Sequence, residues 1–250
     1  MKFLKIITVF SLFILFFIIS FFIHILCFNE NFRLSIKIKN THLFSRLFLK
    51  LCGVTVYHKE LDKRIARASL IVSNHLSYLD MVLISSIIPV VFVASVEVKE
   101  TPILGLFARC SGTIFIERRK ITSLKSEIKQ IKHYLSRGFT ILIFPEGTTS
   151  RGDTVLPFKS SLFNAVIDEN IIIENLCIKY ISIDNTLIDE NNRDFIFYYG
   201  DMTFWPHFIK LLGIKKLYVE IYRAGILNSK NFSSRKELVS FSHKLITEKY

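Results

Sequence analysis

The sequence predicts an α/β domain, a largely parallel sheet flanked by helices, preceded by an N-terminal hydrophobic membrane helix. The first observation is an alternation of short apolar runs, rich in β-branched residues, with helical stretches from residue 54 onward. The second is one long uncharged run near the N-terminus. The third is composition: 250 residues, 50% of them hydrophobic, are too apolar for a disordered chain and fit one domain with an appendage.

The uncharged run extends from Ile6 to Phe28 and is long enough to cross a bilayer as one helix. It ends in His-Ile-Leu-Cys-Phe-Asn-Glu, without the small-residue cleavage site of a secretory signal peptide. We therefore expect residues 1–30 to be a retained membrane anchor and residues 31–250 to form the main domain.

Basic residues flank this run unevenly. Lys2 and Lys5 precede it, and five follow it: Arg33, Lys37, Lys39, Arg46 and Lys50. Because Lys and Arg are enriched on the cytoplasmic side of membrane segments, we expect the main domain on the cytoplasmic face. A helical hairpin that enters and leaves one leaflet would place both flanks on the same side. Spanning and monotopic insertion both fit this distribution.

Elements after the anchor follow from the spacing of apolar residues. Leu and Phe residues four apart, beside Arg46 and Lys50, predict an amphipathic helix over 42–51. A helix over 123–137 has an apolar face that includes Ile128 and Ile131, and Gly138 ends it. No element is predicted for residues 179–216. The remaining predictions are strands at 54–57, 69–72, 90–94, 113–116, 140–144, 171–178 and 217–221, and helices at 77–88, 103–110, 160–169 and 234–249.

The chain carries a formal net charge of +12, from 33 Lys and Arg against 21 Asp and Glu. Such a balance favours an anionic partner, either nucleic acid or an acidic membrane face. The charge is spread along the chain without a nucleic-acid recognition motif, so we expect the membrane and no nucleic acid. The four cysteines lack the spacing of metal ligands, and we expect reduced thiols and no metal.

Two loops after predicted strands carry most of the reactive side chains. Loops beyond the carboxyl ends of parallel strands are where α/β proteins place functional groups. The first loop holds His75 and Asp80, which would lie about 140° apart on a regular helix. They can meet only if His75 precedes the helix and Asp80 lies in its first turn, with Ser77 as the N-cap. The alternative is that Asp80 only closes the helix start in a capping box with Ser77.

The second loop, residues 145–152, has the sequence Pro-Glu-Gly-Thr-Thr-Ser-Arg-Gly. Its backbone amides, three successive hydroxyl groups and Arg151 together suit a phosphate group. The alternative is an ordinary glycine-containing turn with Glu146 in solvent.

The order of these motifs resembles the glycerolipid acyltransferases, which include the lysophosphatidate acyltransferases of phospholipid synthesis. The family's first block, Asn-His followed by four residues and Asp, stands here at 74–80. Its third block, Phe-Pro-Glu-Gly-Thr, is complete at 144–148. The resemblance covers about residues 50–180 and implies an acyltransferase domain over residues 31–250. The second block, which leads to Phe-Ile-x-Arg, is matched by Lys99, Pro102, Gly105 and the run 112–119.

The resemblance also implies a role for each matched residue. His75 is expected to be the general base that takes the proton of the acceptor hydroxyl, and Asp80 to orient its ring. Arg118 is expected to bind the acceptor phosphate, with Arg119 as its substitute. The other expected substrate-binding residues are Glu146, Gly147, Thr148 and Arg151, and Asn74 and Pro145 are expected to support the motifs.

The same resemblance implies the substrates. An acyl group would pass from an acyl thioester, either acyl-CoA or acyl-acyl carrier protein, to the sn-2 hydroxyl of 1-acylglycerol-3-phosphate, with no separate cofactor. Thr149 follows Thr148 where the family usually has Arg, as in relatives that act on other acceptors. Another lysolipid, such as lyso-ornithine lipid, is therefore the alternative acceptor. Bacterial members imply an inner-membrane location with the catalytic domain on the cytoplasmic face.

Other functions fit parts of the sequence. A membrane-bound acyl thioesterase would use the same base with water in place of the lipid hydroxyl. A non-enzymatic membrane protein of this fold is a further alternative, but it would not need His75, Asp80 and Glu146 together. The aromatic stretch 198–207 is expected to pack in the core, with the lining of an acyl-chain groove as the alternative.

Overall fold

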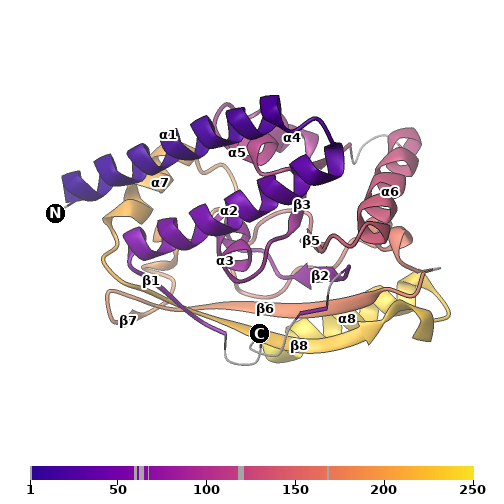
Figure 1. Cartoon of the computed structure of the whole chain (residues 1–250). Coiled ribbons are helices and arrows are strands. Elements are labelled where there is room, and N and C mark those ends of the chain that lie inside the picture. Colours follow the sequence, from indigo (N-terminus) through magenta and orange to yellow (C-terminus); the bar gives the residue numbers. More distant parts are fainter. Residues whose placement is uncertain (1, 59–60, 62–64, 67, 118–120, 168) are drawn as a thin grey trace.

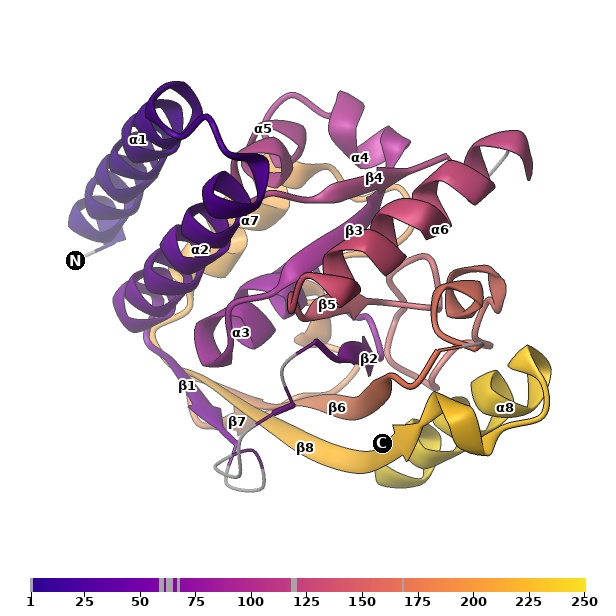
Figure 2. The same cartoon turned by 45° about the vertical axis from the view of Figure 1, so that its right-hand side comes forward.

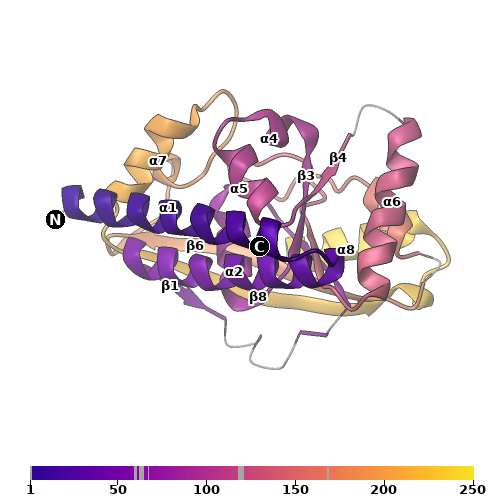
Figure 3. The same cartoon turned by 45° about the horizontal axis from the view of Figure 1, so that its top comes forward.

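The structure, a computed structural model, describes residues 2–58, 61, 65–66, 68–117, 121–167 and 169–250, with the backbone alone for residue 2 and residues 121–124. Two long helices, α1 (Lys2–Leu26) and α2 (Glu30–Cys52), run side by side in opposite directions (Figures 1 and 3). Both helices lie at one side of the domain (Figure 2), where α1 contacts α5 and α7 as well as α2. The predicted anchor is therefore one half of a helical pair that packs on the domain.

The sheet is mixed but largely parallel, as predicted. Its strand order is β1-β8-β6-β2-β5-β3-β4, and β7 (Thr186–Leu187) pairs with β6. Neighbouring strands are parallel except for β6 beside β8 and β6 beside β7. The bounds in chain order are β1 (Val54–Tyr57), β2 (Leu70–Ser73), β3 (Val91–Ser95), β4 (Ile114–Ile116), β5 (Ile141–Ile143), β6 (Ile172–Ile183) and β8 (Leu217–Asn228).

Helices cover both faces of this sheet. Side chains alternate along each strand, so Ile71 of β2 packs in one core and its neighbours Leu70 and Val72 in the other. The core around Ile71 includes residues of α3 (Leu79–Ile87) and α7 (Phe204–Gly213). The opposite core includes residues of α6 (Ile121–Ser136) and α8 (Arg235–Lys249). The short helices α4 (Val96–Glu100) and α5 (Leu104–Cys110) connect β3 to β4.

Several predicted elements differ from the observed ones. The helix expected over 160–169 is wrong: the structure has only a short 3₁₀ turn, η2 (Ser161–Ala165). Serine, asparagine and β-branched residues in this stretch disfavour a longer helix. The helix expected over 77–88 begins two residues later, at Leu79. The unassigned stretch 179–216 contains the end of β6, the turn η3 (Arg193–Phe195) and α7, while a last turn, η4 (Ser229–Asn231), follows β8.

Helix α2 is much longer than the amphipathic helix expected over 42–51. Its N-cap Asn29 accepts a hydrogen bond from the backbone nitrogen of Phe32 through its side chain, at 3.0 Å. Its C-cap Gly53 has a φ of +71°, a left-handed conformation that glycine adopts without strain. The two caps explain why the helix extends over the whole of residues 30–52.

Helix α1 combines an apolar composition with direct contacts to the domain. The segment Phe3–Leu26 is long and apolar enough to cross a membrane, and 22% of its most apolar stretch is buried. At its start, Lys5 Nζ donates hydrogen bonds to the carbonyl oxygens of Cys52, at 3.0 Å, and Ile214, at 2.6 Å. Further along, the ring of Phe13 contacts the rings of Phe48 in α2 and Phe208 in α7, both at 5.8 Å between centroids.

Candidate active site

The two loops predicted to carry the reactive side chains, one with His75 and one with Glu146, meet at one edge of the sheet. Strands β2 and β5 are adjacent and parallel, with Val72 opposite Ile143. Their carboxyl ends therefore lie side by side, and His75 and Glu146 follow within three residues of those ends. The backbone nitrogen of His75 donates a hydrogen bond to Glu146 Oε1 at 2.6 Å, which joins the loops directly.

His75 and Asp80 are brought together, as the predicted loop-and-first-turn arrangement requires. His75 Nδ1 lies 2.8 Å from Asp80 Oδ2, and Asp80 is fully buried in the first turn of α3. An ionised carboxylate only accepts hydrogen bonds, so the proton of the neutral ring lies on Nδ1 and the lone pair on Nε2. The His75 side chain is 17% exposed, which leaves the ring within reach of a substrate.

Asp80 also stabilises the start of the helix. The carboxylate therefore does both things considered above: it binds His75 and it caps the helix. Its Oδ2 atom accepts hydrogen bonds from the backbone nitrogens of Leu76, at 2.6 Å, and Ser77, at 2.9 Å. The residue before the helix is Tyr78, and no side-chain hydrogen bond caps it. The Ser77 hydroxyl accepts a hydrogen bond from the backbone nitrogen of Leu79 at 3.4 Å, so Ser77 and Asp80 both contribute to the start of the helix.

Asn74 fixes the first loop to strand β6. Its side chain accepts a hydrogen bond from the backbone nitrogen of Ile178, at 2.8 Å, and donates one to the carbonyl oxygen of the same residue, at 3.0 Å. Asn74 is 1% exposed, so neither contact competes with water. This pair of bonds extends the β2–β6 pairing by one residue and gives Asn74 a supporting position.

Glu146 is buried, and both of its carboxylate oxygens bind backbone nitrogens. Besides the contact with His75, its Oε2 atom accepts a hydrogen bond from the nitrogen of Leu156 at 2.9 Å. The alternative of Glu146 in solvent is therefore wrong. Burial raises the pKa of this carboxyl to about 7, against the opposing effect of the two backbone donors. Next to it, Gly147 has a φ of +76° and donates its N–H to the carbonyl of Phe144, which makes a tight turn.

The remaining predicted residues lie around this turn or outside the described residues. Thr148 is exposed, and the Arg151 side chain is 60% exposed, 3.8 Å from Asp153 and over the Tyr199 ring. The Pro145 carbonyl accepts a hydrogen bond from the nitrogen of Lys159, which anchors the far side of the loop. Arg118 and Arg119 lie outside the described residues. Among the residues that are described, no group of three or more His, Cys, Asp and Glu could hold a metal ion.

Two tyrosines that the sequence reasoning missed contact these loops. The Tyr180 hydroxyl of β6 donates a hydrogen bond to Asp80 Oδ1 at 2.6 Å. The Tyr250 hydroxyl donates one to the carbonyl oxygen of Gly152 at 2.7 Å. Each partner is about a hundred residues away in the chain, and no local motif marks it. The one available signal was that Tyr180 follows Ile178 at strand spacing.

An apolar cavity of about 140 Å³ lies beside the first loop. Tyr78, within the His-x4-Asp segment, forms part of its wall. In the aromatic stretch 198–207, His207 is buried in the core, 2.9 Å from the Tyr78 hydroxyl, and Phe204 lines the cavity. Other walls come from several helices and include Phe13, Phe16, Phe44, Phe48, Phe107 and Ala108.

Comparisons with known proteins identify the family of this chain. The crystal structure of the 1-acyl-sn-glycerophosphate (LPA) acyltransferase PlsC from Thermotoga maritima has the same fold, with a TM-score of 0.62 at 20% identity over 98% of this chain and 95% of that chain. A family model described as Acyltransferase matches residues 53–179, which include both loops. The chain therefore belongs to the acyltransferase family.

Relatives in this family carry more than one kind of name. A lyso-ornithine lipid O-acyltransferase of Rhizobium meliloti is 32% identical over 201 residues, 77% of this chain and 68% of that protein. A 1-acyl-sn-glycerol-3-phosphate acyltransferase of Escherichia coli is 32% identical over 145 residues, 56% of this chain and 59% of that protein. A protein of the same name from Neisseria gonorrhoeae is 34% identical over 111 residues, 44% of each chain.

Proposed function

We propose that this acyltransferase moves a fatty acyl group from an acyl thioester to the sn-2 hydroxyl of 1-acylglycerol-3-phosphate, and so forms phosphatidate. The observation that carries the proposal is the His75–Asp80 pair, joined at 2.8 Å in a segment whose Tyr78 lines the apolar cavity. A base beside an apolar cavity suits a reaction between a hydroxyl group and a fatty acyl chain. The names of the Escherichia coli and Neisseria relatives support this acceptor.

The base acts through His75 Nε2, because Nδ1 is hydrogen bonded to Asp80. Nε2 takes the proton of the acceptor hydroxyl while the oxygen attacks the carbonyl carbon of the thioester. The tetrahedral intermediate collapses, the C–S bond breaks, and the imidazolium returns the proton to the departing thiolate. Asp80 holds the ring in place and stabilises the imidazolium in between. The acceptor itself is the nucleophile, so no acyl-enzyme forms.

The acceptor head group is held by the loop after β5 and its neighbours. Arg151 and Thr148 are exposed on this loop and offer charged and hydroxyl donors to a phosphate group. Arg118 and Arg119 are included among the phosphate-binding residues on the family resemblance alone, because they lie outside the described residues. Glu146 acts through the shape of the loop, because its two oxygens already bind backbone nitrogens.

The acyl chain of the donor occupies the apolar cavity. Long hydrocarbon chains need an apolar, water-free space, and the walls of the cavity are mostly apolar. Either acyl-CoA or acyl-acyl carrier protein would supply the chain and keep its own carrier group outside the cavity. Helix α1 contributes Phe13 and Phe16 to the wall, so the anchor also belongs to the substrate site.

The chain binds an anionic membrane with α1 lying along the surface of the domain. Lys5 ties the start of α1 to the domain, and Val9, Phe16 and Ile23 are buried along its length. A helix attached in this way inserts from one side, which favours monotopic insertion over spanning. Its free face is apolar and suits lipid, with exposed side chains that include Phe3, Ile7, Ile14, Ile18, Phe21 and Phe22. The basic residues on both flanks of α1 support a position of the catalytic domain on the cytoplasmic face of the bacterial inner membrane.

Lyso-ornithine lipid is a second candidate acceptor. The relatives of Rhizobium meliloti, Brucella abortus and Rhodobacter capsulatus are all named lyso-ornithine lipid O-acyltransferases, at 30–33% identity. Thr149 in place of the expected Arg removes one cation from the loop, which favours a head group with less negative charge than a phosphate monoester.

Membranes that contain the protein, or its His75→Ala variant, test the reaction and the acceptor together. They are incubated with a long-chain acyl thioester and radiolabelled lysophosphatidate or lyso-ornithine lipid, and both lipid products and free thiol are measured. Phosphatidate formed by the wild type alone is the expected result. If product formed from lyso-ornithine lipid alone, the proposed acceptor would be wrong and the proposed reaction type would stand. Release of thiol without either lipid product would show a thioesterase and overturn the proposal.

A further inference from the structure

Asp80 receives hydrogen bonds on both of its carboxylate oxygens, from different parts of the chain. Oδ2 accepts from its own loop, namely from His75 Nδ1 and two backbone nitrogens. Oδ1 accepts from Tyr180 of β6, at 2.6 Å. The loop contacts alone would leave the carboxylate free to rotate about Oδ2. The contact from the sheet fixes the second oxygen and with it the plane of the carboxylate.

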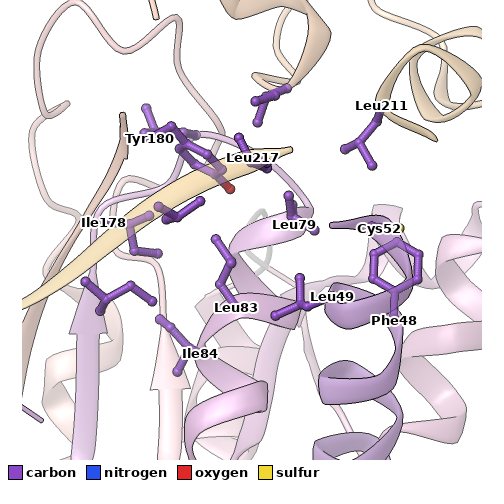
Figure 4. Packing of buried hydrophobic residues seen from close by; sticks show 14 of the residues in the cluster. Phe48, Leu49, Cys52, Leu79, Leu83, Ile84, Ile178, Tyr180, Leu211 and Leu217 are labelled. Atoms are coloured by element: carbon purple, nitrogen blue, oxygen red, sulfur yellow. The ribbon is translucent and has the colours of Figure 1, made fainter. Parts of the chain in front are cut away.

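Tyr180 is itself held rigidly. It is 7% exposed and packs in the core, where its ring meets the edge of the Phe197 ring at a centroid distance of 5.5 Å. Figure 4 shows it among buried side chains, with the hydroxyl oxygen directed toward the helix that carries Leu79 and Leu83. Burial and the neighbouring Asp80 hold the pKa of Tyr180 well above its usual range, so the hydroxyl keeps its proton and is always a donor.

Strand β6 contacts the first loop at a second place, two residues earlier. Asn74 is bonded to both backbone groups of Ile178, and side chains at 178 and 180 point to the same face of the strand. The first loop is therefore fixed at the residue before the base and again at the residue that orients the base. One rigid strand sets both positions.

We propose that Tyr180 is a positioning residue for acyl transfer, which aligns the Asp80 carboxylate with the ring of His75 by binding its second oxygen. The inference rests on the proposed function in one respect, since His75 must be the base of the reaction. Tyr180 does not touch the substrate in this role. It acts through Asp80 and determines how firmly, and in which orientation, the imidazole is held.

The Tyr180→Phe variant removes only the hydroxyl and tests this role. Oδ1 then has no donor, so the carboxylate becomes more basic and attracts the imidazolium more strongly. The expected result is a loss of about tenfold in kcat with unchanged KM values for donor and acceptor. The acidic limb of the pH profile of kcat/KM is expected to move to higher pH. Among the described residues, titratable side chains that interact electrostatically with Asp80 include His75, Tyr180, Glu146 and Tyr250, and the substitution changes only the Tyr180 contact.

Tyr134 of α6 provides a matched control. It is also 7% exposed, and its hydroxyl also donates to a carboxylate, Glu30 Oε1, at 3.2 Å. The contact joins α6 to α2 and has no link to the loops of the site. The Tyr134→Phe variant is expected to keep the wild-type kcat and pH profile. Equal losses in the two variants, or a Tyr180→Phe enzyme with wild-type kcat and pH profile, would overturn the proposal.

A second measurement does not depend on the activity. Diethylpyrocarbonate modifies the neutral form of imidazole. Mass spectrometry then gives the rate at which His75 is modified as a function of pH. In Tyr180→Phe the midpoint of this curve is expected to shift to higher pH, and in Tyr134→Phe to stay at the wild-type value. A wild-type enzyme that acylates no lysolipid would refute the proposed function, while the shift at His75 would still report on Tyr180. An unshifted midpoint in Tyr180→Phe would overturn the positioning role even in an active enzyme.

Discussion

The Glu146 carboxylate accepts a hydrogen bond from the backbone nitrogen of His75, so the acidic residue of the second loop holds the backbone of the residue proposed as the base. The same carboxylate reaches Leu156 on its other side. Its position at the centre of the loop cluster makes it a structural link between β2 and β5. Because the group is buried, its charge state affects stability.

Raising the pH is expected to destabilise the wild type at this residue. The pKa of Glu146 is raised in the folded state from 4.5 to about 7, so its contribution to stability is complete below pH 4.5 and is lost as the pH rises through about 7. The Glu146→Gln variant cannot ionise. As the pH rises from 4.5 to above 7, the free energy of unfolding should fall less in this variant than in the wild type. The difference between the two falls should be up to about 3 kcal/mol.

Thermal unfolding in detergent at several pH values measures this difference. The exposed Glu169→Gln change provides a control that should follow the wild type at every pH. A Glu146→Gln curve parallel to that of the wild type would show that folding does not raise the pKa of Glu146.

Removal of the base is expected to abolish acyl transfer. The His75→Ala variant should lose between about a hundredfold and ten-thousandfold in kcat, because a positioned base contributes that much. Its melting temperature should stay close to the wild-type value, since the imidazole is partly exposed. The exposed His133→Ala change on α6 is the matched control. Retention of more than about a tenth of the activity in His75→Ala would assign the base elsewhere.

Arg151 is expected to select for a phosphate head group. The Arg151→Ala variant should raise KM for lysophosphatidate about tenfold and leave KM for the acyl donor unchanged, because a charge-assisted hydrogen bond is lost. Arg137→Ala, at the exposed end of α6, removes the same charge away from the site. Equal KM values for lysophosphatidate in the two variants would exclude Arg151 from head-group binding.

The cavity is expected to set the length of the acyl chain. Ala108 lines it, and the Ala108→Phe change would fill part of its volume of about 140 Å³. The kcat/KM for long-chain thioesters should fall at least about tenfold, with little effect on medium-chain donors. Ala108→Ser, which barely changes the size, should keep the wild-type preference. A uniform loss over all chain lengths would show that the acyl chain lies elsewhere.

The local parts of the site could be predicted from the sequence, whereas its long-range parts could not. The spacing of His75 and Asp80 forced a loop followed by a helix start, and the structure shows that arrangement. The partners of Asn74 and Asp80 come from β6, about a hundred residues later. Nothing in the local pattern indicates which strand lies next to β2. That order follows from the packing of the whole sheet.

The errors in the predicted elements have a similar origin. Strand β8 was expected to end at 221 but continues to Asn228, because it pairs with β6 over most of its length. Helix α7 was missed because its aromatic residues suggested core packing without a regular helical spacing. Its rings pack against one another and against α1, and these tertiary contacts stabilise the helix.

The attachment of α1 has a practical consequence for making this enzyme. A chain shortened by its first 28 residues, for work without detergent, would lose the Lys5 contacts and also Phe13 and Phe16. The rings of Phe44, Phe48, Phe107 and Phe208, which pack against α1, would then face water. The truncated protein would aggregate more readily than the full chain, and the apolar cavity would be open on the side of α1. The N-terminal segment is therefore needed for an intact domain. The appropriate sample is the whole chain in a mild detergent or in nanodiscs.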